Sequence, residues 1–226
     1  MSHPRYCAQF IPPSGKVLDV GSGKGKFVCA MAALGYDVFG IEINPEYVRE
    51  AQERAHLEKV AAHLQEGVAE RLPFENDSFD FLNCSEVTEH VENPSEVLRE
   101  MFRVLKVGGY AYISFHNRFG VYDYHYHMWG INWLPRRWAD GLLILLGKSK
   151  EDGVAGRQTL GGMHYFTYTR ACELLKKCGF SVADIREAKL RQLFPRLHWL
   201  LRPVYKVFVR SLYFNTFHLL VQKHDK

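Results

Sequence analysis

The sequence predicts an α/β fold in which a single domain is built around a doubly wound, seven-stranded, mostly parallel β-sheet. Short apolar runs alternate with helical patterns from Lys16 onward, which is typical of successive βαβ units. The chain has 226 residues, 47% of them hydrophobic and 24% charged, and this composition suits one sizeable core. The core is expected at about residues 16–116, 164–186 and 217–221, with lid-like insertions at about 117–163 and 188–215.

Seven segments have the apolar or alternating character of strands and end at turn-forming residues. They are residues 16–20, 37–43, 63–67, 79–84, 110–115, 180–186 and 217–221. The segment 79–84 is apolar on both faces, as expected of a central parallel strand. Gly108 and Gly109 are expected to turn the chain before the fifth strand.

The helices are predicted from capping residues at their first turns and from Gly at their ends. A first helix follows the Gly-rich turn after residue 20 and runs through Leu34 to Gly35. A second helix is expected to begin at Asn44 and Pro45. A third should begin at Asn93 and Pro94 and end near Leu105, and a fourth should begin at Thr167 and end at Cys178. Asn93 and Glu96 should form a capping box, in which Asn93 accepts an amide hydrogen bond and Glu96 reaches back.

The composition argues against an exported, disulfide-bonded or membrane-spanning protein. The five Cys residues are scattered and include no C-x-x-C pair, so neither a disulfide framework nor a zinc knuckle is indicated. The first residues lack the pattern of a secretion signal, and no run approaches the roughly 18 apolar residues of a membrane span. We therefore expect a cytoplasmic protein that is at most peripheral to a membrane.

The charge is distributed unevenly along the chain. After Glu187 the sequence holds eight basic residues and one acidic residue, a net charge of +7, whereas the preceding part holds 21 basic and 24 acidic residues, a net charge of −3. This asymmetry predicts an anionic surface or partner near the C-terminal segment.

The string VLDVGSGKGKF places Gly21, Gly23 and Gly25 directly after the first strand and before a helix, where backbone can approach a ligand because no Cβ intervenes. A dinucleotide fingerprint would need Gly where Lys26 stands, which argues against a nicotinamide-dependent oxidoreductase. Glu42 ends the second strand, where a carboxylate can accept hydrogen bonds from both hydroxyls of an adenosine ribose. The alternative interpretation is a tight turn beside a surface acid.

Several blocks, in order, resemble the class I, Rossmann-like methyltransferases that use S-adenosylmethionine, and specifically the group that includes ubiquinone and menaquinone biosynthesis enzymes (methyltransferase type 11 domain). The blocks are VLDVGSGKG, YDVFGIEIN, EGVAERLPFENDSFD and EVTEHVENPSEVLREMFRVLKVGG, covering about residues 16–116, and then CELLKKCGF and FHLLVQKH. The resemblance implies methyl transfer from S-adenosylmethionine, S-adenosylhomocysteine as the product, and an antiparallel last strand.

The resemblance also implies which residues surround the cofactor. Around the methionine portion these are Asp19, Gly21, Ser22, Gly23 and Gly25. Glu42 would hold the ribose, and Ile43 would pack on the adenine ring, whose edge Ala69 and Glu70 would contact. The sulfonium would lie beside Asn83, Cys84 and Ser85, and the pocket would be shaped by His90. Val68 stands where the family usually has an Asp that hydrogen-bonds the adenine amino group, and Val107 replaces the usual Pro.

The candidate catalytic residues lie in a His-rich segment after the fifth strand. A methyl sulfonium is already a strong electrophile, so the enzyme chiefly aligns an acceptor and can remove a proton from it. His116, His125 and His127 are the main candidate bases, and Asp123 and His164 are further ones, because the segment begins at the edge where open α/β sheets bind ligands. The alternative for each is a role in packing or in a lid.

A metal is not expected. Glu86, Glu89 and His90 form E-x-x-E-H on a predicted helix, and two carboxylates with an imidazole on one face could bind a divalent ion. The motif occurs in metal-dependent relatives but is also commonplace in metal-free members of the group, so we assign no metal ligand.

The two insertions are expected to face the acceptor. Residues 129–146 hold three Trp, two adjacent Arg and a short apolar run, and Leu197, Leu200, Leu201, Val204, Phe208 and Leu212 recur at helical spacing. His198, Arg202, Lys206 and Arg210 fall four apart on another face, with Pro203 expected to kink or divide the helix. One interpretation is a lid with its apolar face on the domain and a solvated basic face, and another is membrane contact through 188–215.

The acceptor is therefore expected to be a small or lipid-like molecule methylated on oxygen or carbon. Methylation of a nucleic acid is an alternative that the same charges permit, although no RNA-binding module is recognisable. A non-catalytic S-adenosylmethionine-binding protein is the second alternative. The oligomeric state is not predicted.

Overall fold

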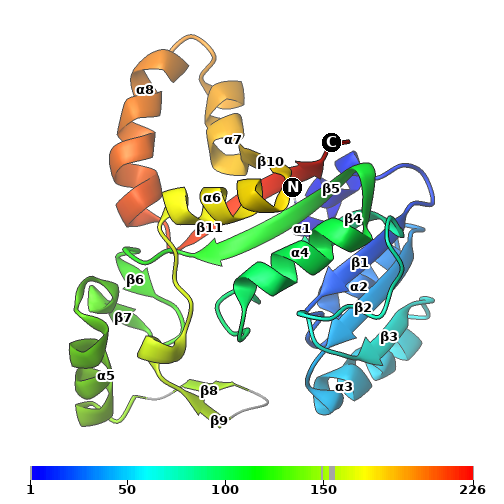
Figure 1. Cartoon of the computed structure of the whole chain (residues 1–226), viewed down its shortest axis with the longest axis horizontal. Helices are drawn as coiled ribbons and strands as arrows, with labels where there is room; N and C mark the ends of the chain where they lie inside the picture. The colour runs from blue at the N-terminus through cyan, green and yellow to red at the C-terminus, as the bar shows by residue number, and fades with distance from the viewer. Residues whose placement is uncertain (1, 149, 153–155, 226) are drawn as a thin grey trace.

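The central feature of the computed structural model, which describes residues 2–148, 150–152 and 156–225, is a seven-stranded sheet (Figure 1). Its strands are β1 (Lys16–Val20), β2 (Asp37–Glu42), β3 (His63–Glu66), β4 (Phe79–Cys84), β5 (Leu105–His116), β10 (Phe180–Asp184) and β11 (Thr216–Lys223). Their order is β10-β11-β5-β4-β1-β2-β3. β11 runs antiparallel to both of its neighbours, and the other pairs are parallel. This confirms the predicted sheet and its antiparallel last strand.

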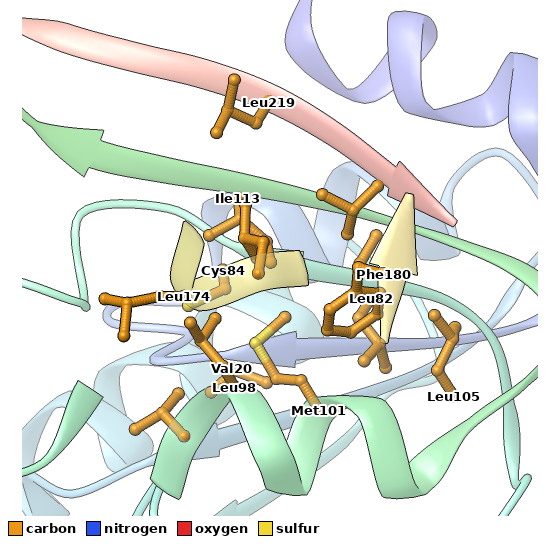
Figure 2. Packing of buried hydrophobic residues seen from close by; sticks show 14 of the residues in the cluster. Val20, Leu82, Cys84, Leu98, Met101, Leu105, Ile113, Leu174, Phe180 and Leu219 are labelled. Carbon is orange, nitrogen blue, oxygen red and sulfur yellow. The ribbon is translucent and has the colours of Figure 1, made fainter. Parts of the chain in front are cut away.

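An apolar core lies on each side of the sheet because successive strand residues point to opposite faces. Leu18 and Leu82 face α4 (Pro94–Val104) and α6 (Tyr168–Cys178), and Figure 2 shows Leu98, Met101 and Leu174 of these helices in that packing. Val17 and Phe81, one position earlier on the same strands, belong to the core that includes α1 (His3–Cys7) and α2 (Lys26–Ala32). A further helix beside the sheet, α3 (Pro45–Leu57), contacts α2, β2 and β3.

The predicted helix starts are confirmed by side-chain caps, with one exception. The side chains of Asn44, Asn93 and Thr167 accept hydrogen bonds from amides of the first turns of α3, α4 and α6. The expected capping box is wrong in its second half, because the carboxylate of Glu96 pairs with Arg99. The Asn93 amide donates instead to Glu70 Oε1, at 3.5 Å.

Several predicted boundaries also need correction. β5 begins at Leu105, so Gly108 and Gly109 lie inside the strand, at a register irregularity where Phe79 pairs with Leu105 and Phe81 with Tyr110. α2 ends at Ala32 rather than beyond Leu34. The predicted strand 180–186 stops at Asp184 because its carboxylate accepts amide hydrogen bonds from residues 186 and 187 and thereby caps α7 (Ile185–Leu193).

The first insertion, after β5, forms a unit with its own small apolar core. It comprises β6 (Tyr122–Asp123), β7 (Met128–Trp129), η2 (Ile131–Trp133), α5 (Arg136–Leu145), β8 (Lys150–Asp152), β9 (Gly156–Gln158) and η3 (Leu160–Gly162). Tyr126, Ile131 and Leu160 are buried together in that core. In Figure 1 the unit extends from the end of β5, away from the sheet.

The second insertion is a helical arm, defined here as residues 185–213, that projects from the sheet between β10 and β11 (Figure 1). It consists of α7, α8 (His198–Val204) and the π-helix η4 (Tyr205–Tyr213), so Pro203 lies inside α8 and the helical path continues beyond it. No helix of the described residues has the length and apolar content needed to cross a membrane.

The amphipathic pattern of the arm is oriented opposite to the lid interpretation. Glu187 on α7 lies 2.6 Å from Arg202 Nε and 3.7 Å from Lys206 Nζ, so the basic face is directed toward acidic groups of the same arm. The apolar residues are outside, with Trp199 74% exposed and Phe208 61% exposed. The expectation of a buried apolar face is therefore wrong for this segment, whereas the Arg202 side chain on the basic face stays 50% exposed.

Both insertions are attached to the sheet at one junction. Asn117 follows β5, and its backbone amide donates to the carbonyl of Asn215, which directly precedes β11. The Asn117 side chain donates to the carbonyls of Ser211 and Phe214 at the end of the arm. The amide of Tyr122 in the first insertion donates to the Asn215 side chain.

Candidate functional site

The turn after β1 has the backbone that its three glycines predict. Gly21, Gly23 and Gly25 have φ values of +71°, +51° and +74°, in the left-handed region that glycine adopts without strain. A Cβ on Gly21 would lie 2.3 Å from a methyl carbon of Val87, so this position has no room for a side chain. At Gly23, by contrast, no atom of the described residues outside the adjacent turn would lie within 4 Å of a Cβ. The turn therefore presents open space at Gly23, as a ligand-binding loop requires.

Glu42 is held against this turn. Its Oε2 accepts a hydrogen bond from the Gly23 amide at 2.8 Å, and its Oε1 accepts one from the Asn44 amide at 3.0 Å. Each carboxylate oxygen can accept more than one hydrogen bond, so the group retains capacity for ligand hydroxyls. Ile43 and Val68, which follow the paired ends of β2 and β3, are 48% and 42% exposed. Apolar side chains are thus displayed next to the carboxylate, where the sequence predicts the adenine ring.

Asp19 and Asn83 connect β1 and β4 at the same end of the sheet. The Asn83 side-chain amide donates to Asp19 Oδ1 at 2.6 Å, and Asp19 is 3% exposed. Burial raises the pKa of Asp19 to about 8, although the Asn83 hydrogen bond opposes this shift. His3 Nε2, on α1, lies 2.9 Å from Asn83 Oδ1 and extends the chain of contacts. Sequence reasoning missed His3, because no local pattern connects it with a residue 80 positions away.

The other predicted cofactor residues have varied surroundings. Cys84 is fully buried in the core, so its side chain packs there and only its backbone can face a ligand. Ala69 packs partly against the same core, and Ser85 is half-buried. Glu70 accepts hydrogen bonds from the amides of Glu92 and Asn93 and so ties its loop to the start of α4. Ser22 is buried, and its Oγ has no hydrogen-bond partner among the described residues.

The E-x-x-E-H motif forms a turn rather than the predicted helix. Glu86 has a φ of +59°, which a helix does not allow, and its amide donates to Ser114 Oγ on β5. The turn directs Glu89 into the protein, where the residue is completely buried. His90 lies at the margin, with its Nε2 3.8 Å from Glu89 Oε1.

Glu86 and Glu89 meet two histidines from outside the motif. His116, at the end of β5, has its Nδ1 3.1 Å from Glu89 Oε1 and 3.5 Å from Glu86 Oε2. His125, from the first insertion, has its Nε2 3.9 Å from Glu89 Oε1. One ligand atom from each of these four side chains lies within 4.8 Å of all the others. We call these four residues the His–Glu cluster.

The electrostatics of the cluster favour an ion pair between His116 and Glu89. Burial alone would lower the pKa of His116, but the hydrogen bond and charge of Glu89 raise it overall. Burial would likewise raise the pKa of Glu89, but His116 lowers it overall. His116 is 2% exposed, and its Nε2 has no hydrogen-bond partner among the described residues.

The remaining candidate bases are not brought to the cluster in the same way. Asp123 is buried and accepts hydrogen bonds from two backbone amides of the first insertion, from Asn132 and from Tyr165, so it organises that insertion and is not placed as a base. His127 is exposed, with its Nδ1 3.2 Å from the Tyr122 hydroxyl. The His164 backbone amide donates to the carbonyl of Glu89, and its ring stacks on Phe166.

Comparisons with known proteins identify a methyltransferase domain in part of the chain. Residues 18–113 match the family model described as a methyltransferase domain. A ubiquinone biosynthesis O-methyltransferase from Pseudomonas fluorescens is 39% identical over 104 residues, 46% of this chain and 45% of that protein. An uncharacterized methyltransferase from Mycobacterium leprae is 38% identical over 116 residues, 50% of this chain and 42% of that protein. The chain thus spans about half the length of these curated relatives.

Solved structures extend the likeness of fold to nearly the whole chain. A SAM-dependent methyltransferase from Methanosarcina mazei has a TM-score of 0.64 at 23% identity and covers 97% of both chains. The [4+2]-cyclase SpnF has a TM-score of 0.63 at 16% identity and covers 99% of this chain and 80% of its own. One fold therefore carries different chemistry, and the residues at the site must decide the reaction.

Proposed function

Because this chain carries a class I, S-adenosylmethionine-dependent methyltransferase domain, we propose that it transfers a methyl group from S-adenosylmethionine to a small or lipid-like acceptor. The observation that supports this most is the arrangement of the open Gly23 turn and the Glu42 carboxylate at the same sheet edge as the His–Glu cluster. The bound cofactor supplies an electrophilic methyl carbon, and the electron pair of the broken S–C bond stays on sulfur as S-adenosylhomocysteine. The acceptor gains the methyl group and loses a proton.

On the cofactor side, the chain's own residues bind and orient. Glu42 would accept hydrogen bonds from the ribose hydroxyls, and Ile43 and Val68 would cover the adenine ring. Gly21 and Gly23 leave room for the methionine portion beside the Asp19–Asn83 pair. We propose that six further residues line the same cofactor pocket: Ser22, Gly25, Ala69, Glu70, Ser85 and His90.

On the acceptor side, His116 and His125 are the proposed catalytic residues. His116 is the last residue of β5, and His125 follows it in the first insertion. Glu89 holds His116 by Nδ1 and leaves Nε2 facing away from that carboxylate. In its neutral form, His116 would accept at Nε2 the proton of a hydroxyl or carbon acceptor placed here. His127 is no longer proposed for this role because its ring is engaged at the surface with Tyr122.

An apolar groove supports a lipid-like acceptor. A cavity of about 360 Å³ lies between the two insertions and is lined by Val121, Trp133, Phe208, Val209, Leu212 and Tyr213. All of these side chains are apolar or aromatic, so the groove suits a hydrocarbon portion better than a charged one. The amide of Val121 donates to the carbonyl of Leu212, which fixes the two sides of the groove relative to each other.

The same features support peripheral membrane contact through residues 188–215. Leu193, Trp199, Leu200 and Phe208 of the arm are each at least 54% exposed. Exposed apolar and Trp side chains beside the exposed cations Lys189, Arg191 and Arg196 are typical of a segment that lies in an anionic membrane interface. Methylation of a nucleic acid is less well supported, because Glu187 and Asp184 partner much of the positive charge.

Vesicle flotation tests this contact. The intact chain should float with vesicles containing anionic phospholipid, and the double variant Trp199→Ala, Phe208→Ala should float markedly less. Leu57→Ala removes a comparably exposed apolar residue of α3 and should float like the parent. Failure of the parent chain to float at low salt would overturn the membrane contact and leave the methyl transfer standing.

Calorimetric titration tests the proposed function itself. We expect micromolar binding of S-adenosylmethionine and S-adenosylhomocysteine, and loss of both in Glu42→Ala but not in Glu46→Ala, an exposed acid four positions away. Absence of binding, or binding of NADH instead, would overturn the proposal. Binding without S-adenosylhomocysteine production from any quinol, phenol or lipid acceptor would favour a non-catalytic binding protein.

A further inference from the structure

The His–Glu cluster has the composition and spacing of a metal site. Its four side chains come from three parts of the chain: Glu86 and Glu89 from the turn after β4, His116 from the end of β5, and His125 from the first insertion. Each offers one ligand atom within 4.8 Å of the other three. Ligand atoms about 2.0–2.2 Å from one ion lie roughly 3 to 4.4 Å apart, so the longest separations in the cluster would shorten when an ion binds.

The buried carboxylate of Glu89 provides a second, independent observation. His116 Nε2 and Glu89 Oε2 have no hydrogen-bond partner among the described residues, and these two residues are 2% and 0% exposed. Buried polar atoms are nearly always satisfied by protein, water or an ion, because leaving them unpaired is costly. A cation bound in the cluster would supply the missing partner of Glu89 Oε2. His116 faces both carboxylates through Nδ1, so it would bind the ion through that nitrogen and keep its proton on Nε2.

We propose that Glu86, Glu89, His116 and His125 bind one divalent first-row transition-metal ion of the manganese, iron, cobalt or zinc type. Two imidazole nitrogens favour such ions over magnesium and calcium, which prefer oxygen ligands throughout. Two carboxylates neutralise the charge of the dication, so the occupied site would not repel a sulfonium nearby. His90, the third residue of the sequence motif, is not in this set, and two histidines that no motif links to it take its place.

The surroundings of the cluster fix the ligands as a metal site requires. Ser114 Oγ on β5 accepts a hydrogen bond from the Glu86 amide at 2.8 Å, and Thr88 Oγ1 donates to the Ser114 carbonyl at 3.1 Å. These contacts hold the turn that carries both carboxylates against β5. On the other side, Asp123 accepts hydrogen bonds from the His125 amide and the Tyr165 hydroxyl, and the Tyr165 ring packs on His116.

The inference deepens the proposed function. Four protein ligands leave further coordination positions for water or an acceptor oxygen, and coordination to a dication lowers the pKa of a hydroxyl. His116 would then act as a metal ligand, and the acceptor would lose its proton because coordination to the metal lowers the pKa of the acceptor hydroxyl. Without a metal, His116 itself would be the base, and the two roles can be separated by experiment.

Binding of the metal alone is the direct test. The intact chain, freed of metal with a chelator, should bind one Mn²⁺ per chain, measured by electron paramagnetic resonance, and one Co²⁺ with visible absorption bands indicating nitrogen ligands. Mg²⁺ should bind at least about tenfold more weakly. No binding of Mn²⁺, Co²⁺ or Zn²⁺ below millimolar concentration would overturn the inference.

The variants Glu86→Gln and His125→Gln address the ligand set, and both positions are less buried than Glu89 and His116. Each should weaken Mn²⁺ binding at least about tenfold while the circular dichroism spectrum stays unchanged. The matched control is His127→Gln, two positions from His125 but outside the cluster, and it should bind like the parent. Equal binding by all variants would overturn the assignment. S-adenosylmethionine binding, measured on the same samples, separates failure of the metal site from failure of the proposed function.

Discussion

Asp19 and Asn83 face each other across β1 and β4, and the 2.6 Å hydrogen bond between them places a buried carboxyl group at the proposed methionine end of the cofactor. With a pKa of about 8, this group is largely protonated at neutral pH in the folded chain. Because this carboxyl group titrates near neutral pH, we expect the proposed cofactor binding to depend on pH.

The first prediction concerns proton release at Asp19. S-adenosylmethionine carries positive charge, which lowers the pKa of a nearby carboxyl group, so its binding should release protons between pH 6 and 8 and tighten as pH rises toward 8. Calorimetry in two buffers with different ionisation enthalpies measures the released protons. Asp19→Asn should abolish the release, and an unchanged value in that variant would contradict the assignment to Asp19.

The second prediction compares two glycines. Gly23 and Gly35 both have positive φ, and at neither would a Cβ meet another described atom within 4 Å beyond its immediate neighbours. Ala at either position should therefore cost a similar strain, roughly 1 kcal/mol in the free energy of unfolding. Only Gly23→Ala should weaken S-adenosylmethionine binding, by at least about tenfold, because its Cβ enters the proposed ligand space. Titration calorimetry checks this, and equal affinities for the two variants would contradict the placement of the ligand.

The third prediction concerns acid stability. His218 on β11 is paired with the Tyr112 hydroxyl, and burial, together with the charge of Arg186, lowers the pKa of His218 to about 3. The unfolded chain binds a proton at this residue below pH 6.5, whereas the folded chain does not. The contribution of neutral His218 is therefore intact above pH 6.5 and is lost as pH falls toward 3, by about 2 kcal/mol at pH 5. Urea unfolding at pH 7 and pH 5 should show this loss, reduced in His218→Gln and retained in His63→Gln.

The fourth prediction concerns Asp123, which holds the first insertion together. Asp123→Asn keeps the volume but replaces one acceptor oxygen by an NH2 donor, and the groups around this position, including Tyr165 and Asn132, themselves donate. Thermal unfolding should show a loss of about 1–3 kcal/mol, and limited proteolysis should cut the first insertion sooner. Asp37→Asn, at an exposed position, should change stability by less than about 0.5 kcal/mol. A stable, protease-resistant Asp123→Asn would show that these hydrogen bonds do not organise the insertion.

Local signals in the sequence predicted most of the sheet and the cofactor side. The strand 79–84 and the caps at Asn44 and Thr167 depend on neighbours within a few residues, so they can be predicted from the sequence alone. Gly21 and Glu42 are also placed by strand ends, which a βαβ pattern already orders.

The His–Glu cluster could not be predicted in the same way. Its formation depends on the left-handed backbone of Glu86, which breaks the expected helix, and on the approach of His125 from an insertion whose fold has no sequence signature. The arm was misjudged for a related reason. A helical pattern shows that two faces differ, but the pairing of Arg202 and Lys206 with Glu187 depends on where α7 lies.

The junction of Asn117 and Asn215 links the motions of the two insertions. The arm ends two residues before β11, and the first insertion begins directly after β5, so each has little chain in which to absorb a displacement independently. Because Thr216 is paired with His116, the same rung of the sheet also carries a residue of the cluster. We therefore expect a displacement of the arm to be transmitted to the first insertion and to the end of β5.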